Sequence, residues 1–381
     1  MPRLRDLIQP PHKLEPGAHN AITDVSGVAV GQHTIIRGDG SWRPQGGPLR
    51  TGVTLVLPHQ GNMYEDKVSA AVHTINGFGK VLGFEQVREL GALESPIALT
   101  GTLNVPRVAD ALISLAIERN PHIGLGFAES GRRGYASVNV VVGETSDGFL
   151  SDIQARPIGD NEVREALATV TTGMVEQGVV GAGTGTSCFG WKGGIGTASR
   201  VLHPDAGGFT IGALVQTNYG RPDELTILGV PVGLSLVPPS DLETPDEPRS
   251  EGGSIMIVLA TDAPLDARQL SRLCKRATFG LARTGSTCHG GSGDFVIAFS
   301  TTNRIPDRSH NLVEDQARVH EQTIMSSLAL AVIEAVEEAI YNSLFMARTI
   351  IGRDGHTRHA LPIDDVVRLF ENAGLERAKA Q

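Results

Sequence analysis

The chain has 381 residues, of which 40% are hydrophobic and 20% charged, as in an ordinary globular protein, so disorder of the whole chain is not expected. Its formal net charge of −9 argues against a nucleic-acid partner or an anionic membrane surface. The 46 glycines and 21 prolines exceed the usual share and predict many tight turns or close backbone approaches.

Apolar periodicity predicts an irregular, proline-rich arm over residues 1–20, then alternating strands and helices. Strands are predicted, in chain order, at Ile22–Val30, Gly52–Pro58, 136–143, 209–217, 226–237, 254–261 and 294–300. Helices are predicted at 105–119, 163–174, 264–282, 312–347 and 362–373, three of them with a proline near the start. Since these elements do not form regular βαβ units, we expect a layered α/β sandwich rather than a Rossmann sheet.

The sharpest change in composition lies at residues 238–253, PPSDLETPDEPRSEGG. Four prolines and five acidic residues in 16 positions leave almost nothing to bury, which predicts a mobile, exposed linker. The strongly apolar run SIMIVLAT follows at once over 254–261 and predicts a buried strand.

The junction Gly252-Gly253-Ser254 has two interpretations. It can be a flexible turn before a strand. It can also be a self-cleaving bond, because a glycine carbonyl is easily approached and the Ser254 hydroxyl can attack it to form an ester that water hydrolyses. The freed α-amine, with a pKa of roughly 7.7–8.0, could then act as a base for the hydroxyl of its own residue.

Three cysteines, Cys188, Cys274 and Cys288, form an odd and sparse set that implies no disulfide framework. No cysteine or histidine cluster has zinc-ligand spacing. The N-terminus lacks the apolar core of a secretory signal, and no apolar stretch is long enough to span a membrane. We therefore expect a cytoplasmic protein without a metal.

A series of motifs in fixed order resembles the self-processing aminopeptidases, the family that includes L-aminopeptidase/D-esterases and β-peptidyl aminopeptidases. The motifs are RLRDL at 3–7, NAITDVSGVAVGQHT at 20–34, TGVTLVLPH at 51–59, SPIALTGTLNV at 95–105, GETSDGFLSDI at 143–153, GAGTGTSCFGWKGGIGTASR at 181–200, GALVQTNYG at 212–220, the strand at 252–261 and GGSGDFVIAFST at 290–301. The resemblance implies a four-layer αββα sandwich, similar to the N-terminal-nucleophile hydrolases but with different connectivity.

The same resemblance implies roles for particular residues. Ser254 is implied to be the nucleophile, exposed by cleavage after Gly253. Asn218 is implied to donate to the oxyanion, a contribution typically worth roughly 3–4 kcal/mol. Ser292 and Asp294 are implied to orient the nucleophile or its amine and to relay a proton, and Glu144 to hold the substrate's ammonium group.

The chain departs from the family pattern at three places. Ser146 and Phe149 stand where relatives often carry a tyrosine, although Tyr219 lies beside Asn218. The family pattern NGxGE reads NGFGK over 76–80, so that Lys80 replaces an acid. Asp294 is one methylene shorter than the glutamate of some members.

Several other residues have a structural interpretation beside a chemical one. The glycines of GAGTG at 181–185 lack nucleotide-loop spacing and are expected to allow close chain approach. Lys192 and Arg200 are expected in structural contacts, Lys192 in a salt bridge. His356 and His359 are expected in solvent, Cys188 and Cys288 as small buried residues, and His289 is an alternative base near Ser292.

We therefore expect an autoproteolytically activated serine aminopeptidase with fragments 1–253 and 254–381 in one composite domain. It would release N-terminal residues from short peptides, amides or esters through an acyl-Ser254 intermediate, with no cofactor, as a homo-oligomer of four or more copies. The alternatives are a self-cleaving acyltransferase related to ornithine acetyltransferase, which uses threonine at the cleavage point, and an uncleaved scaffold or binding protein.

Overall fold

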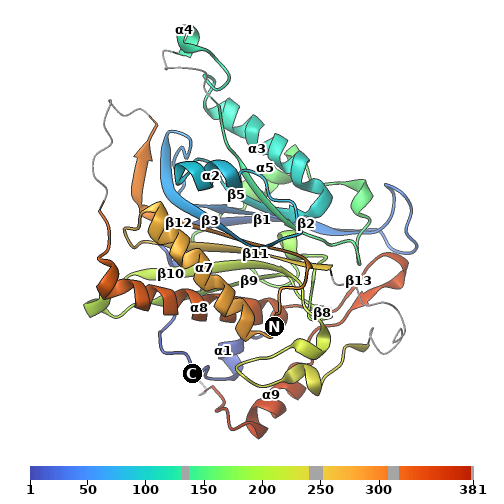
Figure 1. The fold of residues 1–381 in the computed structure, drawn as a ribbon. Helices are drawn as coiled ribbons and strands as arrows, with labels where there is room; N and C mark the ends of the chain where they lie inside the picture. Colours follow the sequence, from blue (N-terminus) through green and yellow to red (C-terminus); the bar gives the residue numbers. More distant parts are fainter. Residues whose placement is uncertain (131–136, 240–251, 308–316, 379–381) are drawn as a thin grey trace.

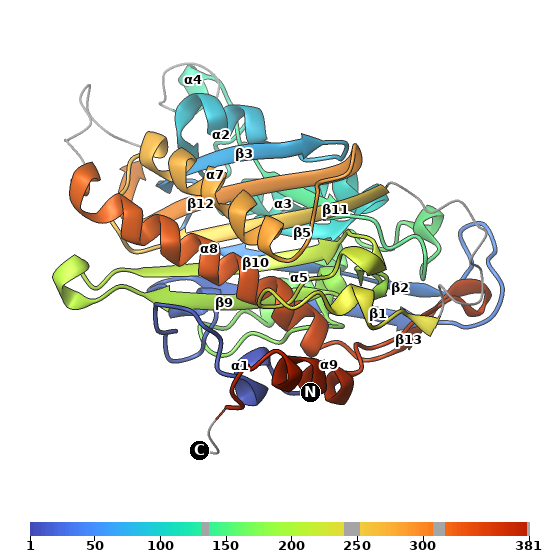
Figure 2. The same cartoon turned by 60° about the horizontal axis from the view of Figure 1, so that its bottom comes forward.

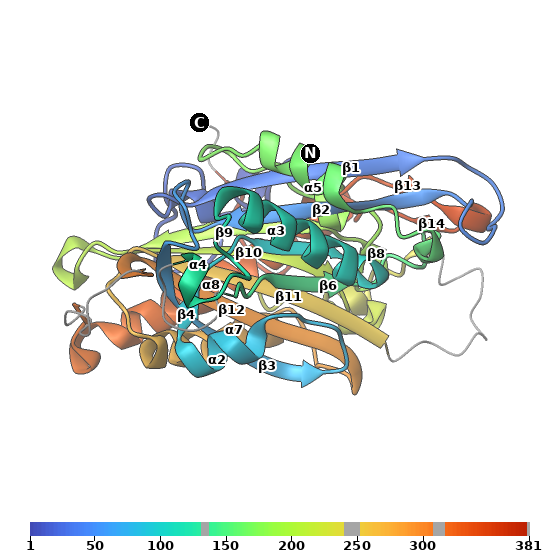
Figure 3. The same cartoon turned by 90° about the horizontal axis from the view of Figure 1, so that it is seen from above.

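Two β-sheets pack face to face, and helices cover both outer faces (Figures 1 and 3). This computed structural model describes residues 1–130, 137–239, 252–307 and 317–378. Three apolar cores separate the four layers: one between the sheets and one beneath each helical layer. The αββα sandwich implied by the sequence resemblance is confirmed.

The larger sheet has six strands and contains residues from both sides of the Gly253–Ser254 bond. Its order is β4 (Ala92–Leu93), β3 (Asp66–Gly77), β12 (Gly291–Pro306), β11 (Gly252–Thr261), β10 (Thr210–Asn218) and β9 (Ile195–Val201). β11 pairs parallel to β12 and antiparallel to β10. The run at 254–261 therefore forms a central strand, as its unbroken apolar character predicts.

The smaller sheet has four strands, in the order β1 (Ala29–Arg37), β2 (Leu49–Leu57), β5 (Ile97–Gly101) and β6 (Val141–Thr145). β6 lies against β11 of the facing sheet: a Cβ placed on Gly143 would stand 2.7 Å from the Met256 sulfur. A glycine at position 143 thus lets the two sheets approach closely at the middle of β6.

Two long helices cover each outer face. α3 (Val105–Arg119) and α5 (Asp160–Ala168) cover the four-stranded sheet, and α7 (Ala267–Arg283) and α8 (Glu321–Phe345) cover the six-stranded one (Figure 2). Asp266 caps α7 by accepting from the Gln269 amide at 2.7 Å. No described helix is long and apolar enough to cross a membrane.

Short elements complete the chain. They are α1 (Leu4–Leu7), α2 (Phe84–Leu90), α4 (Phe127–Ser130), α9 (Ile363–Asn372) and the hairpins β7 (Ser187–Cys188) with β8 (Trp191–Lys192) and β13 (Ile350–Ile351) with β14 (Thr357–Arg358). A bridge from Ile8 to Arg377 places the two ends of the chain side by side. The predicted linker 238–253 lies mostly outside the described residues, as does part of the predicted helix 312–347.

Two predicted strands are wrong. Ile22–Asp24 is a 3-10 turn, and the strand begins only at Ala29, because Gly27 turns the chain with a φ of +90°. Residues 226–237 form turns rather than a strand. There Leu228 and Gly229 both have positive φ, and Ile227 and Val230 close the turn with two 2.9 Å hydrogen bonds.

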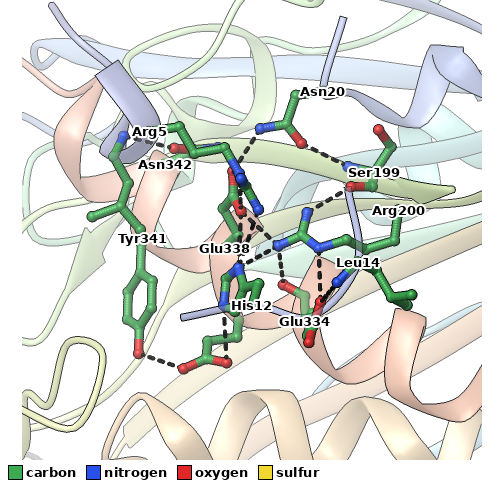
Figure 4. A network of polar contacts seen from close by, with 12 residues as sticks. Arg5, His12, Leu14, Asn20, Ser199, Arg200, Glu334, Glu338, Tyr341 and Asn342 are labelled. Carbon is green, nitrogen blue, oxygen red and sulfur yellow. Dashed lines mark hydrogen bonds and ion pairs between the residues drawn. The ribbon is translucent and has the colours of Figure 1, made fainter. Parts of the chain in front are cut away.

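A buried charge cluster joins the N-terminal arm, β9 and α8 (Figure 4). The Arg200 guanidinium, fully buried, lies 2.6 Å from Glu338 and 3.1 Å from Glu334, both on α8. Arg5 lies 2.9 Å from Glu338, and His12 3.3 Å from it. Arg200 is therefore structural, as expected.

The arginines keep the buried carboxylate charged. Burial alone would raise the pKa of Glu338, but the positive charges of Arg200, Arg5 and His12 hold that pKa well below its usual value. The cluster ties residues before Gly253 to residues after it without a covalent bond.

We predict that Glu338→Gln lowers the free energy of unfolding by about 3–5 kcal/mol, because it leaves two guanidinium groups near an uncharged amide. The measurement is urea denaturation. Glu118→Gln is the matched control, since Glu118 pairs with Arg164 on the exposed surface and should change stability little. Equal, small changes in the two variants would contradict the prediction.

Candidate active site

Four strands end or begin at one edge of the two facing sheets and bring the predicted site residues together. In the register of the larger sheet, Ser254 on β11 lies opposite Asn218 on β10 and Gly293 on β12. Ser292 and Asp294 flank Gly293 in sequence. Three strands from separate parts of the chain thus meet around a single serine.

The Gly253–Ser254 bond lies inside the hydrogen-bonded ladder, with Gly253 opposite Ser292. A Cβ placed on Gly253 would stand 3.1 Å from Ser292 Oγ and 3.2 Å from Tyr219 Cα. The Ser292 hydroxyl therefore packs against the backbone at Gly253. A residue larger than glycine would push it away from this position.

Ser292 and Asp294 form a buried pair. Ser292 Oγ donates to Asp294 Oδ1 at 2.6 Å, so the shorter aspartate side chain reaches this hydroxyl. Asp294 Oδ2 is buried and has no hydrogen-bond partner among the described residues. Burial raises the pKa of Asp294 from its usual value, and the bond from Ser292 opposes this rise only in part.

The amide of Asn218 is oriented by the β7 hairpin. Its Oδ1 accepts from the Ser187 backbone amide at 3.0 Å, which leaves Nδ2 as the available donor. Ser187 is held in turn by Arg358, whose Nε donates to Ser187 Oγ at 2.9 Å. Arg358 stacks over the Phe149 ring, 3.7 Å from its centroid. Sequence spacing gives no signal for this link between residues 187 and 358.

Glu144, at the end of β6, is buried rather than on the surface, with 4% of the residue exposed. Its Oε1 accepts from the Lys80 backbone amide at 2.9 Å, and the Lys80 ammonium lies 3.9 Å from the same oxygen. Burial raises the pKa of Glu144, although Lys80 acts in the opposite direction.

Residues 76–80, which are the end of β3 and the turn after it, are here called the bridging loop. They join the start of β12 to the end of β6. Asn76 Nδ2 donates to the carbonyl oxygens of Ser292, His289 and Gly290, at 2.5 to 3.2 Å. The Phe78 amide donates to Ser292 O at 3.2 Å. The loop therefore fixes the distance between Glu144 and the Ser292 backbone.

Neither Tyr219 nor Phe149, which stands where relatives often carry a tyrosine, places a phenol hydroxyl at the edge where Ser254 lies. Tyr219 Oη pairs with Thr284 Oγ1 at 2.9 Å, and its buried ring packs against Phe189. Phe149 stacks on His356 with 4.7 Å between ring centroids, and His356 also bonds the Phe149 carbonyl. The Phe149 ring is thus used to support Arg358.

Lys192 is structural, but the expected salt bridge is wrong. Its fully buried ammonium donates to the carbonyl oxygens of Gly183, Thr186 and Gly193 at 2.7 to 2.9 Å. Burial lowers the pKa of Lys192 to about 7, whereas three carbonyl acceptors favour the charged form. The glycines at 181–185 do allow close approach: a Cβ on Gly185 would lie 1.9 Å from Arg50 O.

The remaining sequence candidates lie in other environments. Burial raises the pKa of the Cys188 thiol to about 12, so it is a poor nucleophile. His289 Nε2 lies 2.9 Å from Glu224, and its carbonyl accepts from the Ser292 amide. No group of three or more metal-ligating side chains occurs in the part of the chain that the structure describes.

Sequence reasoning missed Asp147, three residues after Glu144. This carboxyl group is fully buried, and burial raises its pKa to about 6. Its Oδ2 has no hydrogen-bond partner among the residues that the structure describes. A polar stretch such as TSDG carries no sign of this burial in its own pattern.

We predict that Asn76→Ala loosens the bridging loop, since it removes donors to three carbonyl oxygens. Amide hydrogen exchange at Phe78 and Lys80 should accelerate roughly fivefold, as expected for the loss of about 1 kcal/mol of local stability. Asn62→Ala is the control, because Asn62 pairs with Asn120 away from this loop. Unchanged exchange at both amides in the Asn76 variant would show that the loop is held by other contacts.

Known proteins are similar to this chain over most of its length. The family model described as peptidase family S58 matches residues 20–358. The β-peptidyl aminopeptidase BapA of Sphingosinicella xenopeptidilytica is 37% identical over 97% of this chain and 91% of its own length.

Two solved structures share the fold over nearly the whole chain. A Burkholderia sp. β-aminopeptidase superposes with a TM-score of 0.83 at 39% identity, covering 97% of this chain and 98% of that one. The L-aminopeptidase D-Ala-esterase/amidase from Ochrobactrum anthropi gives 0.86 at 37% identity, covering 98% and 99%. That structure is described as a prototype for the serine aminopeptidases and a new variant among the Ntn hydrolase fold.

Proposed function

Because the chain belongs to peptidase family S58 and is an aminopeptidase, we propose that Ser254 is its nucleophile and that cleavage after Gly253 activates it. The observation that carries this proposal is the register of β11. It sets Ser254 opposite Asn218 and next to the Ser292–Asp294 pair, at the start of a central strand.

Self-cleavage needs a base other than the α-amine, since the nitrogen of Ser254 is still part of an amide. The buried Ser292–Asp294 pair fits this need. The Ser254 hydroxyl gives its proton to Ser292 Oγ, whose own proton passes to Asp294. Ser254 Oγ then bonds to the Gly253 carbonyl carbon, and the proton returns to the nitrogen as the C–N bond breaks. Water hydrolyses the resulting ester.

Turnover then uses two groups of the same residue. The free amine of Ser254 takes the hydroxyl proton while Ser254 Oγ attacks the substrate carbonyl. Asn218 Nδ2 donates to the oxygen that becomes negative. The proton passes to the departing amine, alcohol or ammonia, and water hydrolyses the acyl-Ser254 ester to release the N-terminal residue.

Glu144 is proposed to bind the free ammonium group of the substrate. It is a buried carboxylate at the same sheet edge, and an ion pair there selects chains whose N-terminus is free. Short peptides, amino-acid amides and esters are the proposed substrates. The names of the relatives include β-peptidyl substrates as well as D-alanyl esters and amides.

The two fragments, of 253 and 128 residues, are proposed to remain one composite domain. β9 and β10 come from the first fragment and β11 from the second, yet they are neighbours in one sheet. We further propose a homo-oligomer of four or more copies in the cytoplasm. Its three free cysteines suit a reducing compartment.

We predict that purified protein migrates on a denaturing gel as two fragments split after Gly253, because Ser254 attacks that carbonyl. Ser254→Ala should remain whole, and Ser254→Cys should still be cut, since a thiol is also a nucleophile. Intact-mass analysis identifies the bond. Wild-type chain that stays whole while hydrolysing an alanyl amide would overturn the mechanism, and whole chain without turnover would favour the scaffold alternative. Transfer of the acyl group to an added amine in preference to water would favour the acyltransferase.

We predict a distinct pH dependence for self-cleavage, measured on freshly translated chain, in which no α-amine competes as the base. The rate should fall as pH drops through the pKa of Asp294. Since burial raises that pKa, the fall should occur above the value of about 3.9 that is ordinary for aspartate.

Asp294→Asn should slow the cleavage by about 10²–10⁴ and remove this pH dependence. Glu144→Gln is the control and should keep the dependence. A wild-type rate that is flat down to pH 4 would exclude Asp294 as the base.

A further inference from the structure

We propose that Lys80 and Glu144 form one subsite that selects a substrate whose N-terminal residue carries a carboxylate beside its ammonium group. The inference rests on the proposed function and specifies its substrate class: peptides or amides that begin with an aspartyl residue, linked through its α- or its β-carboxyl group.

The geometry brings one positive and one negative side chain together at the mouth of the site. The Glu144 side chain is 5% exposed, whereas the Lys80 side chain is 61% exposed and its Nζ lies 3.9 Å from Glu144 Oε1. The same oxygen accepts from the Lys80 backbone amide. Oε1 is therefore shared with Lys80, and the Thr102 side chain also hydrogen-bonds the Glu144 carboxylate, so a substrate ammonium would share this carboxylate with both.

The bridging loop keeps the lysine in this position. A Cβ on Gly79 would lie 2.8 Å from the Phe295 ring and 3.4 Å from Glu144 Oε1, so the backbone before Lys80 packs tightly between the two. A Cβ on Gly293 would lie 2.8 Å from Phe78 O. The backbone of Lys80 is thus fixed, and only its side chain is free to move.

The charges decide which substrates fit. An ammonium group that reaches Glu144 also comes close to the ammonium group of Lys80, and like charges repel. A substrate whose N-terminal residue carries no negative group leaves this repulsion uncompensated. A substrate carboxylate bonded to Lys80 turns it into attraction, because charge-assisted hydrogen bonds are the stronger ones.

An aspartyl residue has the two groups at a suitable spacing. In a β-linked aspartyl residue the ammonium and the carboxylate share one carbon atom, and in an α-linked residue one methylene separates them further. Both linkages place the substrate carboxylate within reach of the flexible Lys80 side chain while the substrate ammonium pairs with the Glu144 carboxylate. In the β-linked form, one carbon atom separates the amine-bearing carbon from the scissile carbonyl, as in a β-amino acid.

The test compares aspartyl anilides with their neutral amide counterparts, α-linked asparagine and β-linked isoasparagine anilides, on processed wild-type enzyme. We expect kcat/KM to favour at least one aspartyl substrate over its counterpart roughly tenfold. Lys80→Gln should bring this ratio near one, and Lys80→Glu should invert it. Lys275→Gln, an exposed lysine on α7, is the control and should leave the ratio unchanged.

Two results would overturn the proposal while leaving the proposed function intact: turnover of an alanyl anilide without a preference for either aspartyl linkage, or a preference that survives Lys80→Gln. An equal rise in kcat/KM for every substrate in Lys80→Gln would mean that Lys80 only competes with the substrate ammonium, which also overturns it. Processed enzyme that turns over no anilide would instead reject the proposed function.

Discussion

The hydrogen-bonded register of β11 between β10 and β12 is the constraint on which the site depends. A shift of one residue would turn Ser254 to the opposite face of the sheet and remove it from Asn218. That register is specified on both sides, by an antiparallel ladder with β10 and a parallel ladder with β12. The apolar side chains of β11, buried on both faces, make such a shift costly. Packing in the core therefore sets the position of a hydroxyl group at the edge.

The same sheet explains why a chain with a broken backbone could remain folded. The two strands that follow Gly253, β12 and β11, lie between two pairs of strands that precede it. The buried charge cluster adds a second connection, between β9, the N-terminal arm and α8. Arg200 and Glu338 are fully buried and pair with each other, so separation of the fragments would break this ion pair. The sheet thus both carries the site residues and joins the two fragments, and the charge cluster adds contacts between them at α8.

The sequence was sufficient for the layered fold and for elements with strong periodicity, such as the helix at 105–119 and the strand at 254–261. The prediction of a strand at 226–237 was wrong because its apolar residues are typical of a strand, whereas Leu228 and Gly229 form a turn. Asn218, Glu144, Ser292 and Asp294 were drawn from the family resemblance alone. Ser254 was also indicated by its own surroundings, two glycines between a polar linker and an apolar strand. What the sequence alone could not supply was contact across the fold. The buried state of Asp147, the carbonyl cage of Lys192 and the support of Ser187 by Arg358 all depend on segments far apart in the chain.

The close fit of Gly253 against Ser292 has a consequence for the direction of the proposed cleavage. The proposed cleavage would convert a neutral carbonyl into a terminal carboxylate, formed in the strand ladder beside the Ser292–Asp294 pair. This carboxylate would lie beside the Asp294 carboxyl group, while the new ammonium at Ser254 would gain a neighbour of opposite charge. In the proposed cleavage, repulsion from Asp294 would displace the new chain end and attraction would retain the new amine, which would empty the site and oppose religation.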